Sequence, residues 1–397
     1  MVNFSQHKTS LSTLVLLSYL LTACMHASLK PEQQSESLIH MNATSSEPTQ
    51  DMFLLPAALY YLQNGQIWHL GADSETQQQI THESAPIDAF DIQPASGKLA
   101  YITANTLAIT GADGNGRQVL RAGTALTPIT DELDRLNDPN HITTAMRTPH
   151  WSPDGKQIAF IENGVQVFDL SSNQAQLIWS QSIDSSEPML FESLRAWSPD
   201  GKYLLVSQYP YPIESLYQRS LGVLQLGGPL YAIGASAKVT FAWSPAMTHL
   251  YLANALVGSE KSLMRCELQD MRCTMIAEFE PARWYYYYDH PFVTTDDRLL
   301  VFMGASDDMS QRPQTFNLIS TRLDGYDRNK LRNDGYLLDS ALWSPHGDGI
   351  LIVPAQDAGE ILAGSLVWLS VNDLPARLLP VFQANNLHWG LSLEYKR

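Results

Sequence analysis

Two cysteines in the second half of the chain are spaced to form a disulfide. Cys266 and Cys273 flank the sequence Glu-Leu-Gln-Asp-Met-Arg, and a hairpin turn at Gln269-Asp270 would place them opposite each other on one face of two strands. Cross-strand Cβ atoms lie about 4.5–5.5 Å apart, which is near the separation that a disulfide needs. Because this turn lacks an Asn-Gly or Asp-Gly pair, a register shifted by one residue, with two half-buried thiols, is the alternative.

Three polar residues, Asp91, His150 and His388, have the chemistry to hold a metal ion or an anionic ligand. Each directly precedes the first residue of one copy of the repeat described below. They are therefore expected at one register, near a central channel, in three consecutive repeats. Imidazole and carboxylate groups are common metal ligands when they converge with the correct geometry. The alternative is that they are isolated polar side chains lining a wet channel.

Consecutive aromatic residues form a second candidate site, for a sugar or for a protein surface. Exposed aromatic side chains favour sugar stacking and dominate many protein interfaces. If the run lies in a strand, its side chains alternate between the two faces, so that about half of them pack between neighbouring sheets. The run comprises Trp284, Tyr285, Tyr286, Tyr287 and Tyr288.

The first residues have the order of a secretory signal peptide. A segment carrying Lys8 is followed by an apolar run over residues 11–21, which is shorter than an ordinary membrane-spanning helix needs. The sequence Leu-Thr-Ala-Cys at residues 21–24 resembles the lipobox of bacterial lipoproteins. This resemblance implies that residues 1–23 are removed and that the Cys24 thiol carries a lipid at the cell envelope, outside the cytoplasm. A soluble secreted protein is the alternative.

Residues 24–54 predict a flexible tether behind the lipid. They are rich in Ser, Gln, Glu, Thr and Pro and have no sustained apolar pattern, so they bury too little surface to fold. Removing residues 1–23 removes one lysine and no acid, which changes the formal net charge from −16 to −17. Such a surface repels phosphate backbones and anionic headgroups. We therefore expect no nucleic-acid partner, and membrane attachment through the lipid.

An internal repeat organises the remainder of the chain. The sequence Trp-Ser-Pro-Asp-Gly-Lys begins at Trp151 and again at Trp197, and each copy continues into an alternating apolar segment. Pro and Gly favour a tight turn, and the alternation favours a strand. Degenerate copies begin at Ile92, Trp243, Phe292 and Trp343, and Trp389 ends the series; successive starts are 46 to 59 residues apart. A period in the forties is typical of a four-stranded propeller blade.

This repeat resembles that of the TolB propeller and of the propellers that precede prolyl-oligopeptidase-type catalytic domains. The resemblance implies an all-β fold over residues 55–397, a seven-bladed β-propeller of four-stranded blades, with six or eight blades as alternatives. Residues 59–81 predict three strands without an inner strand, whereas residues 385–393 predict an inner strand with nothing after it. Pairing of the N- and C-terminal strands would complete one blade and hide its edges.

One repeat contains an insertion around residues 127–141, because its starts are 59 residues apart. Thr130 is a candidate cap for a short helix there, with acids in its first turn. Insertions at a propeller rim often shape a binding face. An idle surface loop is the alternative.

The sequence contains no Gly-x-Ser-x-Gly pentapeptide, the nucleophile elbow that a prolyl-oligopeptidase-type catalytic domain uses. We therefore expect a non-catalytic module that binds a protein or glycan partner and needs no cofactor. The alternative is a metal-dependent polysaccharide lyase or another glycan-active propeller enzyme, which would use a divalent metal.

Overall fold

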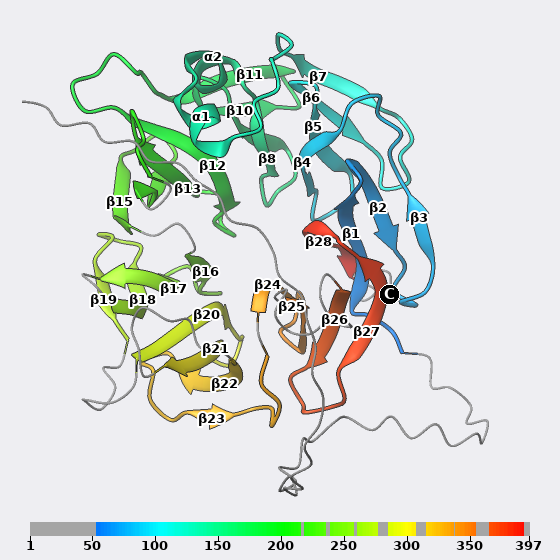
Figure 1. Ribbon diagram of the computed structural model, residues 1–397, viewed down its shortest axis with the longest axis vertical. Helices are drawn as coiled ribbons and strands as arrows, with labels where there is room; N and C mark the ends of the chain where they lie inside the picture. The colour runs from blue at the N-terminus through cyan, green and yellow to red at the C-terminus, as the bar shows by residue number, and fades with distance from the viewer. Residues whose placement is uncertain are drawn as a thin grey trace, which may run out of the picture. The chain divides into compact units, whose positions relative to one another are not determined.

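The computed structural model describes residues 53–215, 218–235, 239–257, 260–276, 285–306, 315–336, 338–354 and 365–392. Their strands form seven antiparallel sheets of four strands each, arranged around a common centre (Figure 1). The prediction of a seven-bladed propeller is thus confirmed. The predicted signal peptide and Cys24 lie outside the described residues. No described helix is long and apolar enough to cross a membrane.

The first blade joins the two ends of the propeller, as predicted. Leu59 pairs with Trp389, and Tyr60 pairs with His388. The indole ring of Trp389 also packs edge-on against Trp368 of the preceding blade, with 5.9 Å between ring centroids. The strands of this first blade, in spatial order, are β28 (Asn385–Ser392), β1 (Ala57–Gln63), β2 (Gln66–Leu70) and β3 (Gln77–Gln79).

The other six blades follow chain order, and the first strand of each lies nearest the centre in Figure 1. Blade 2 comprises β4 (Ile87–Ile92), β5 (Leu99–Thr103), β6 (Thr106–Thr110) and β7 (Gln118–Ala122). Blade 3 comprises β8 (Arg147–Trp151), β9 (Gln157–Ile161), β10 (Gly164–Asp169) and β11 (Gln174–Ser180). Blade 4 comprises β12 (Met189–Trp197), β13 (Tyr203–Pro210), β14 (Ser220–Gln225) and β15 (Leu230–Ala235).

Blades 5 to 7 complete the ring. Blade 5 comprises β16 (Thr240–Trp243), β17 (His249–Val257), β18 (Glu260–Glu267) and β19 (Cys273–Met275). Blade 6 comprises β20 (Tyr285–Val293), β21 (Arg298–Ser306), β22 (Asn317–Arg322) and β23 (Asn329–Lys330). Blade 7 comprises β24 (Leu338–Trp343), β25 (Gly349–Pro354), β26 (Ser365–Ser370) and β27 (Arg377–Phe382).

The repeated Trp-Ser-Pro-Asp-Gly-Lys sequence closes a turn and also joins two blades. The Ser152 hydroxyl donates to Asp154 at 2.7 Å and accepts from the Gln157 amide at 3.0 Å, while Gly155 takes a φ of 66°, a backbone conformation that glycine adopts without strain. The next copy adds an interblade bond, because Trp197 Nε1 donates to the carbonyl of His150 at 3.0 Å. A similar interblade bond is made by Trp343 and Trp389, whereas Nε1 of Trp151 and of Trp243 has no hydrogen-bond partner in the described part of the chain.

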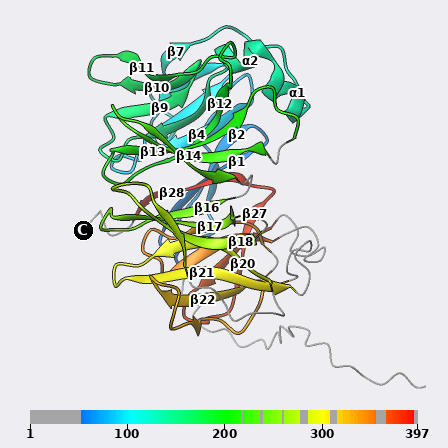
Figure 2. The same cartoon turned by 90° about the vertical axis from the view of Figure 1, so that its left-hand side faces the viewer.

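The insertion between blades 2 and 3 folds into two short helices, α1 (Glu132–Asn137) and α2 (Pro139–Thr144). They lie together on one face of the ring, which we call the insertion face and which is at the right in Figure 2. This is the end of the blades at which the first strands begin; the Ser-Pro-Asp-Gly turns lie at the opposite end. The prediction that Thr130 caps the helix is wrong. The cap is the adjacent Asp131, whose carboxylate accepts from the Asp134 amide at 2.9 Å.

Candidate functional site

The structure brings together the three polar residues that the repeat register singled out. Asp91 on β4, His150 on β8 and His388 on β28 come from the first strands of three consecutive blades. Asp91 lies between the two imidazole rings, with Nδ1 of His150 3.6 Å from Oδ2 and Nδ1 of His388 3.3 Å from Oδ1. We call these three residues the central cluster.

Each member of the central cluster also has a partner outside it. The carboxylate accepts a hydrogen bond from the backbone amide of Trp151 at 2.7 Å. Nε2 of His150 lies 3.2 Å from the carbonyl of Leu194, one blade further on. Nε2 of His388 lies 3.1 Å from Oδ1 of Asn386. The cluster therefore connects the closing strand to blades 2, 3 and 4 through polar contacts whose partners are all supplied by the protein.

The electrostatics of the central cluster favour an ionised carboxylate. Burial opposes ionisation of Asp91, but hydrogen bonding to His150 and the charges of both imidazoles outweigh it and lower its pKa. Burial also lowers the pKa of His388, although the Asp91 carboxylate opposes this shift. Among the residues that the structure describes, no group of three or more His, Cys, Asp and Glu side chains is arranged to hold a metal ion. The cluster thus has the features of an internal tie between blades.

The aromatic run lies at the start of β20, and its two described side chains point into the core. Tyr287 is 4% exposed and Tyr288 is 5% exposed, so neither belongs to an exposed aromatic surface. Trp284 lies outside the described residues, as do the side chains of Tyr285 and Tyr286. This outcome agrees with the expectation that part of the run packs between blades.

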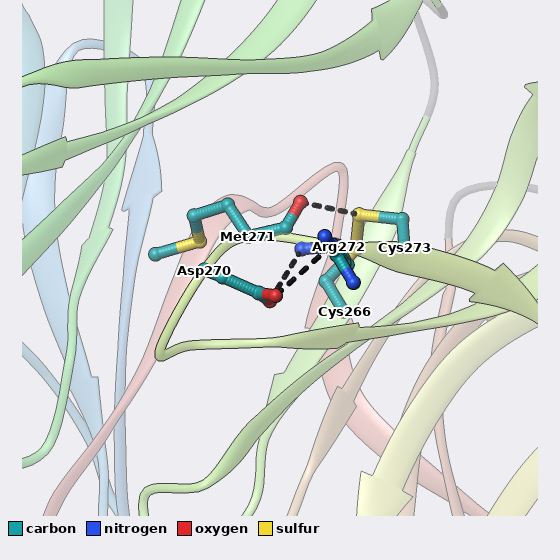
Figure 3. Close-up of a disulfide and its surroundings, with 5 residues drawn as sticks. All are labelled: Cys266, Asp270, Met271, Arg272 and Cys273. Carbon is teal, nitrogen blue, oxygen red and sulfur yellow. Dashed lines mark hydrogen bonds and ion pairs between the residues drawn. A yellow bond between two sulfur atoms is a disulfide. The ribbon is translucent and has the colours of Figure 1, made fainter.

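The two late cysteines face each other across the outer hairpin of blade 5. Cys266 on β18 pairs with Cys273 at the start of β19, and the structure joins them in a disulfide (Figure 3). Met271 takes a positive φ of 55° within the turn, and its amide donates to the carbonyl of Glu267 at 2.8 Å. The disulfide therefore closes a hairpin at the outer edge of the blade, where it has a structural role.

A cavity on the insertion face was not predicted from the sequence. It has a volume of about 670 Å³ and lies between the insertion and residues of β4, β8 and β12. Four charged side chains line it: Asp88, Arg135, Arg147 and Glu192. We call this space the mouth cavity. Its volume falls within the range of about 300–1,000 Å³ that is usual for small-ligand sites.

The insertion that forms one wall of the mouth cavity is fastened at both ends. The side-chain amide of Asn137 donates to the carbonyl of Ile213 at 2.9 Å, and the Ile213 amide donates back to Oδ1 of Asn137 at 3.0 Å. On the blade 2 side, Asn105 donates to the carbonyl of Thr144 at 2.9 Å and accepts from the Met146 amide at 2.6 Å. The wall is thus held by blades 2 and 4, so the insertion is more than an idle loop.

The carboxylates around the mouth cavity have cationic neighbours. Burial raises the pKa of Glu192, and Arg219 opposes that shift from 2.6 Å away. Arg219 also contacts Glu132 of α1 at 2.5 Å. Burial likewise raises the pKa of Asp88, and the charge of Arg135 opposes it. Each of the two carboxylates that line the cavity, Asp88 and Glu192, therefore has an arginine nearby.

Arg147 has two buried nitrogens without a hydrogen-bond partner among the described residues, and Arg219 has one. Nη2 of Arg147 donates to the carbonyl of Phe191 at 3.1 Å, while its Nε and Nη1 are the two nitrogens without a partner in the described part of the chain. Burial lowers the pKa of the guanidinium, and the nearby Tyr209 is the first of the groups that oppose this shift. The length of the insertion was a signal for the cavity, but no feature of the sequence singled out Arg147.

Comparisons with solved structures identify the same fold. Dipeptidyl peptidase 4 from Porphyromonas gingivalis is 10% identical, with a TM-score of 0.51 over 78% of this chain and 48% of that one. Prolyl oligopeptidase B from Galerina marginata is 10% identical, with a TM-score of 0.51 over 84% and 52%. TolB from Acinetobacter baumannii is 14% identical, with a TM-score of 0.42 over 82% and 79%.

The similarity to the two peptidases, each with a TM-score of 0.51, is a similarity of fold. It does not extend to activity, because fold alone does not determine activity. The chain spans about half the length of each of the two peptidases. No protein-family model matches the sequence, and no curated protein sequence matches it.

Proposed function

We propose that this chain is a lipid-anchored propeller of the bacterial cell envelope that binds a protein or glycan partner without catalysing a reaction. The lipobox at residues 21–24 supports the anchor on Cys24. The observation that carries the binding function is the mouth cavity, a concave site of about 670 Å³. Its wall contains a cation, Arg147, with buried nitrogens that have no hydrogen-bond partner among the described residues.

The mouth cavity has the features of a recognition site. Its walls are held in place by hydrogen bonds from blades 2 and 4, so a ligand would meet a preformed surface and little ordering would be needed on binding. Of its two carboxylates, Glu192 forms an ion pair with Arg219 and Asp88 feels the charge of Arg135. The described residues offer no three-ligand metal site, so no observation favours the metal-dependent lyase.

Lipid anchoring is tested by changing Cys24 to Ala in the full-length protein. We expect the variant to keep its signal peptide or to leave the membrane fraction, because the lipid is attached through the thiol. Mass spectrometry of the mature protein and membrane fractionation measure both effects. An unchanged mature mass together with unchanged fractionation would contradict the anchor.

Binding at the mouth cavity is tested by site-specific photocrosslinking in intact cells. A photoreactive amino acid replaces Thr127, an exposed residue that lines the cavity. The matched control replaces Ser172, which is also exposed but lies in the β10–β11 turn at the opposite end of the blades. We expect a discrete adduct from position 127 and none from position 172. Equal labelling from both positions, or no adduct from position 127, would reject the proposed binding site.

A further inference from the structure

We infer that the mouth cavity holds the carboxylate of a peptide, with Arg147 as its counterion. This inference rests on the proposed binding function and names the chemistry of its ligand. The starting observation is that Arg147 lines the cavity while its buried Nε and Nη1 have no hydrogen-bond partner among the described residues. Leaving the donors of a buried cation unsatisfied is costly. An anion bound beside the guanidinium would offset that cost.

The charges around the cavity single out Arg147. Glu192 contacts Arg219 at 2.6 Å, and the charge of Arg135 acts on Asp88. No carboxylate in the described part of the chain forms an ion pair with Arg147, although the charge of Glu192 acts on the guanidinium. Nη2 of Arg147 donates to a backbone carbonyl. The two carboxylates of the wall therefore have other arginines as neighbours, and the Arg147 guanidinium is the group that would attract an external carboxylate.

A second, partly buried arginine adds positive charge on the neighbouring inner strand. Arg195 on β12 donates to the carbonyl of Val239 at 3.1 Å, just as Arg147 on β8 donates to the carbonyl of Phe191 in the next blade. Burial lowers the pKa of Arg195, and the charge of Glu192 opposes the shift. Two cations on neighbouring inner strands thus rely on single carbonyl acceptors, in a chain whose formal net charge is −16.

The lining of the cavity favours a peptide over a sugar. Carbohydrate sites commonly offer aromatic rings for stacking, whereas the apolar part of this wall is aliphatic or small. A peptide carboxylate next to an apolar side chain satisfies both parts of the site, because the carboxylate meets the guanidinium and the side chain meets the apolar wall. The apolar lining includes Ala85, Pro86, Ala89, Leu126, Ile129 and Met146.

The test uses the full-length lipoprotein in detergent and two libraries of acetylated hexapeptides. The last three positions are randomised without Asp or Glu, and the libraries differ only in ending with a carboxylate or with a carboxamide. Affinity selection followed by mass spectrometry measures the recovery of each form. We expect the carboxylate form to be enriched about tenfold, the factor that one charge-assisted hydrogen bond provides. Equal recovery of the two forms, or no recovery of either, would overturn the inference.

Three variants assign the preference to Arg147. Arg147→Gln should bring the ratio of the two forms close to one. Thr127→Asp should lower the ratio severalfold by like-charge repulsion, and it changes only an exposed loop residue. Arg272→Gln removes a positive charge from the remote β18–β19 turn, where the side chain is 83% exposed, and should leave the ratio unchanged.

The outcomes separate this inference from the binding function on which it rests. An unchanged ratio in a folded Arg147→Gln protein would overturn the role of Arg147. If that variant does not fold, Thr127→Asp decides, because an unchanged ratio there would equally exclude a carboxylate in the cavity. If the libraries show no carboxylate preference but position 127 still gives a crosslinked adduct, only the ligand class is wrong. If the libraries show no carboxylate preference and position 127 gives no adduct, the binding function is wrong as well.

Discussion

The central cluster and the mouth cavity use the same inner strands and differ in how their polar groups are satisfied. Asp88 and Asp91 both lie on β4, and Arg147 and His150 both lie on β8. In the central cluster the protein supplies a partner to every imidazole nitrogen and both carboxylate oxygens. In the mouth cavity, two buried nitrogens of Arg147 have no hydrogen-bond partner among the described residues.

This difference separates a structural polar group from a candidate binding group. Buried polar groups in folded proteins almost always have hydrogen-bond partners, so each exception calls for an explanation. A polar cluster that is complete stabilises the fold, and its removal leaves neighbouring groups unsatisfied. A buried polar cluster that lacks hydrogen-bond partners lowers the stability of the fold until a ligand supplies those partners. The two regions should therefore respond in opposite ways to mutation.

The largest effect is expected from removing the strand that carries His388. Deleting residues 385–397 removes β28, which pairs with β1, and leaves an open sheet edge. We expect aggregation, or a melting temperature lowered by roughly 10 °C or more, measured by circular dichroism and size-exclusion chromatography. The control is a deletion of residues 393–397, which keeps all of β28. A monomeric 385–397 deletion with an unchanged melt would show that the closing strand is dispensable.

One substitution in each region compares their contributions to the free energy of unfolding directly. Asp91→Ala leaves the Trp151 amide and both imidazoles without their shared acceptor, so it should lower the free energy of unfolding by about 2–4 kcal/mol. Arg147→Gln removes one hydrogen bond to a carbonyl and one buried charge, so its effect should stay within about 1 kcal/mol. Urea denaturation measures both.

If Asp91→Ala and Arg147→Gln lower the free energy of unfolding equally, the central cluster and the mouth cavity do not differ in their contribution to stability. A larger loss for Arg147→Gln would make the arginine structural. Asp91→Asn sharpens the test, because an amide oxygen can still accept from the Trp151 amide while the charge is lost. Asp91→Asn should lower the free energy of unfolding by less than Asp91→Ala and by more than Arg147→Gln.

A smaller effect is expected from the disulfide, which joins the two outer strands of blade 5 (Figure 3). Replacing Cys266 and Cys273 by Ser together should lower the free energy of unfolding by about 2 kcal/mol, because the bond closes a short loop. Thermal melts measure the loss, and alkylation without reductant shows whether the native thiols are free. Two free thiols in the mature protein, or a loss comparable to that of Asp91→Ala, would contradict this structural role.

The sequence predicted the central cluster and missed Arg147 for a physical reason. His150 directly precedes Trp151, and the turn after that tryptophan recurs in other blades, so its register could be compared with that of Asp91 and His388. On the N-terminal side of His150, the pairing of β8 with β9 shifts register between Arg147 and His150. The irregularity breaks the alternation on which such comparisons depend.

The same reasoning explains other differences between prediction and structure. The hairpin register of Cys266 and Cys273 followed from counting across a short turn, and the structure has that register. The helix cap was placed one residue too early because Thr130 and Asp131 are both good caps, and only the observed bond to the Asp134 amide chooses between them. The mouth cavity joins segments from three blades, and no local pattern encodes such a space.

The smallest effect is expected in the pH dependence of stability, and it tests the central cluster without removing it. Burial lowers the pKa of His388 below its usual value of 6.5, so the folded protein takes up this proton less readily than the unfolded chain. The free energy of unfolding should therefore fall as the pH decreases from 7 through 6.5 toward the lowered pKa. Asp91 does not contribute in this range, because its stabilisation is lost only as the pH falls below 3.8.

His388→Gln should flatten this dependence between pH 7 and pH 5, because it removes the group that titrates differently in the two states. The groups facing His388 are Asp91, whose charge raises its pKa, and His150, whose charge lowers it; both are retained in the variant. The exposed His82, changed to Gln, is the matched control. Melting temperatures across this range measure the slope. An equal slope in wild type and His388→Gln would mean that the imidazole is not held by the protein as the central cluster requires.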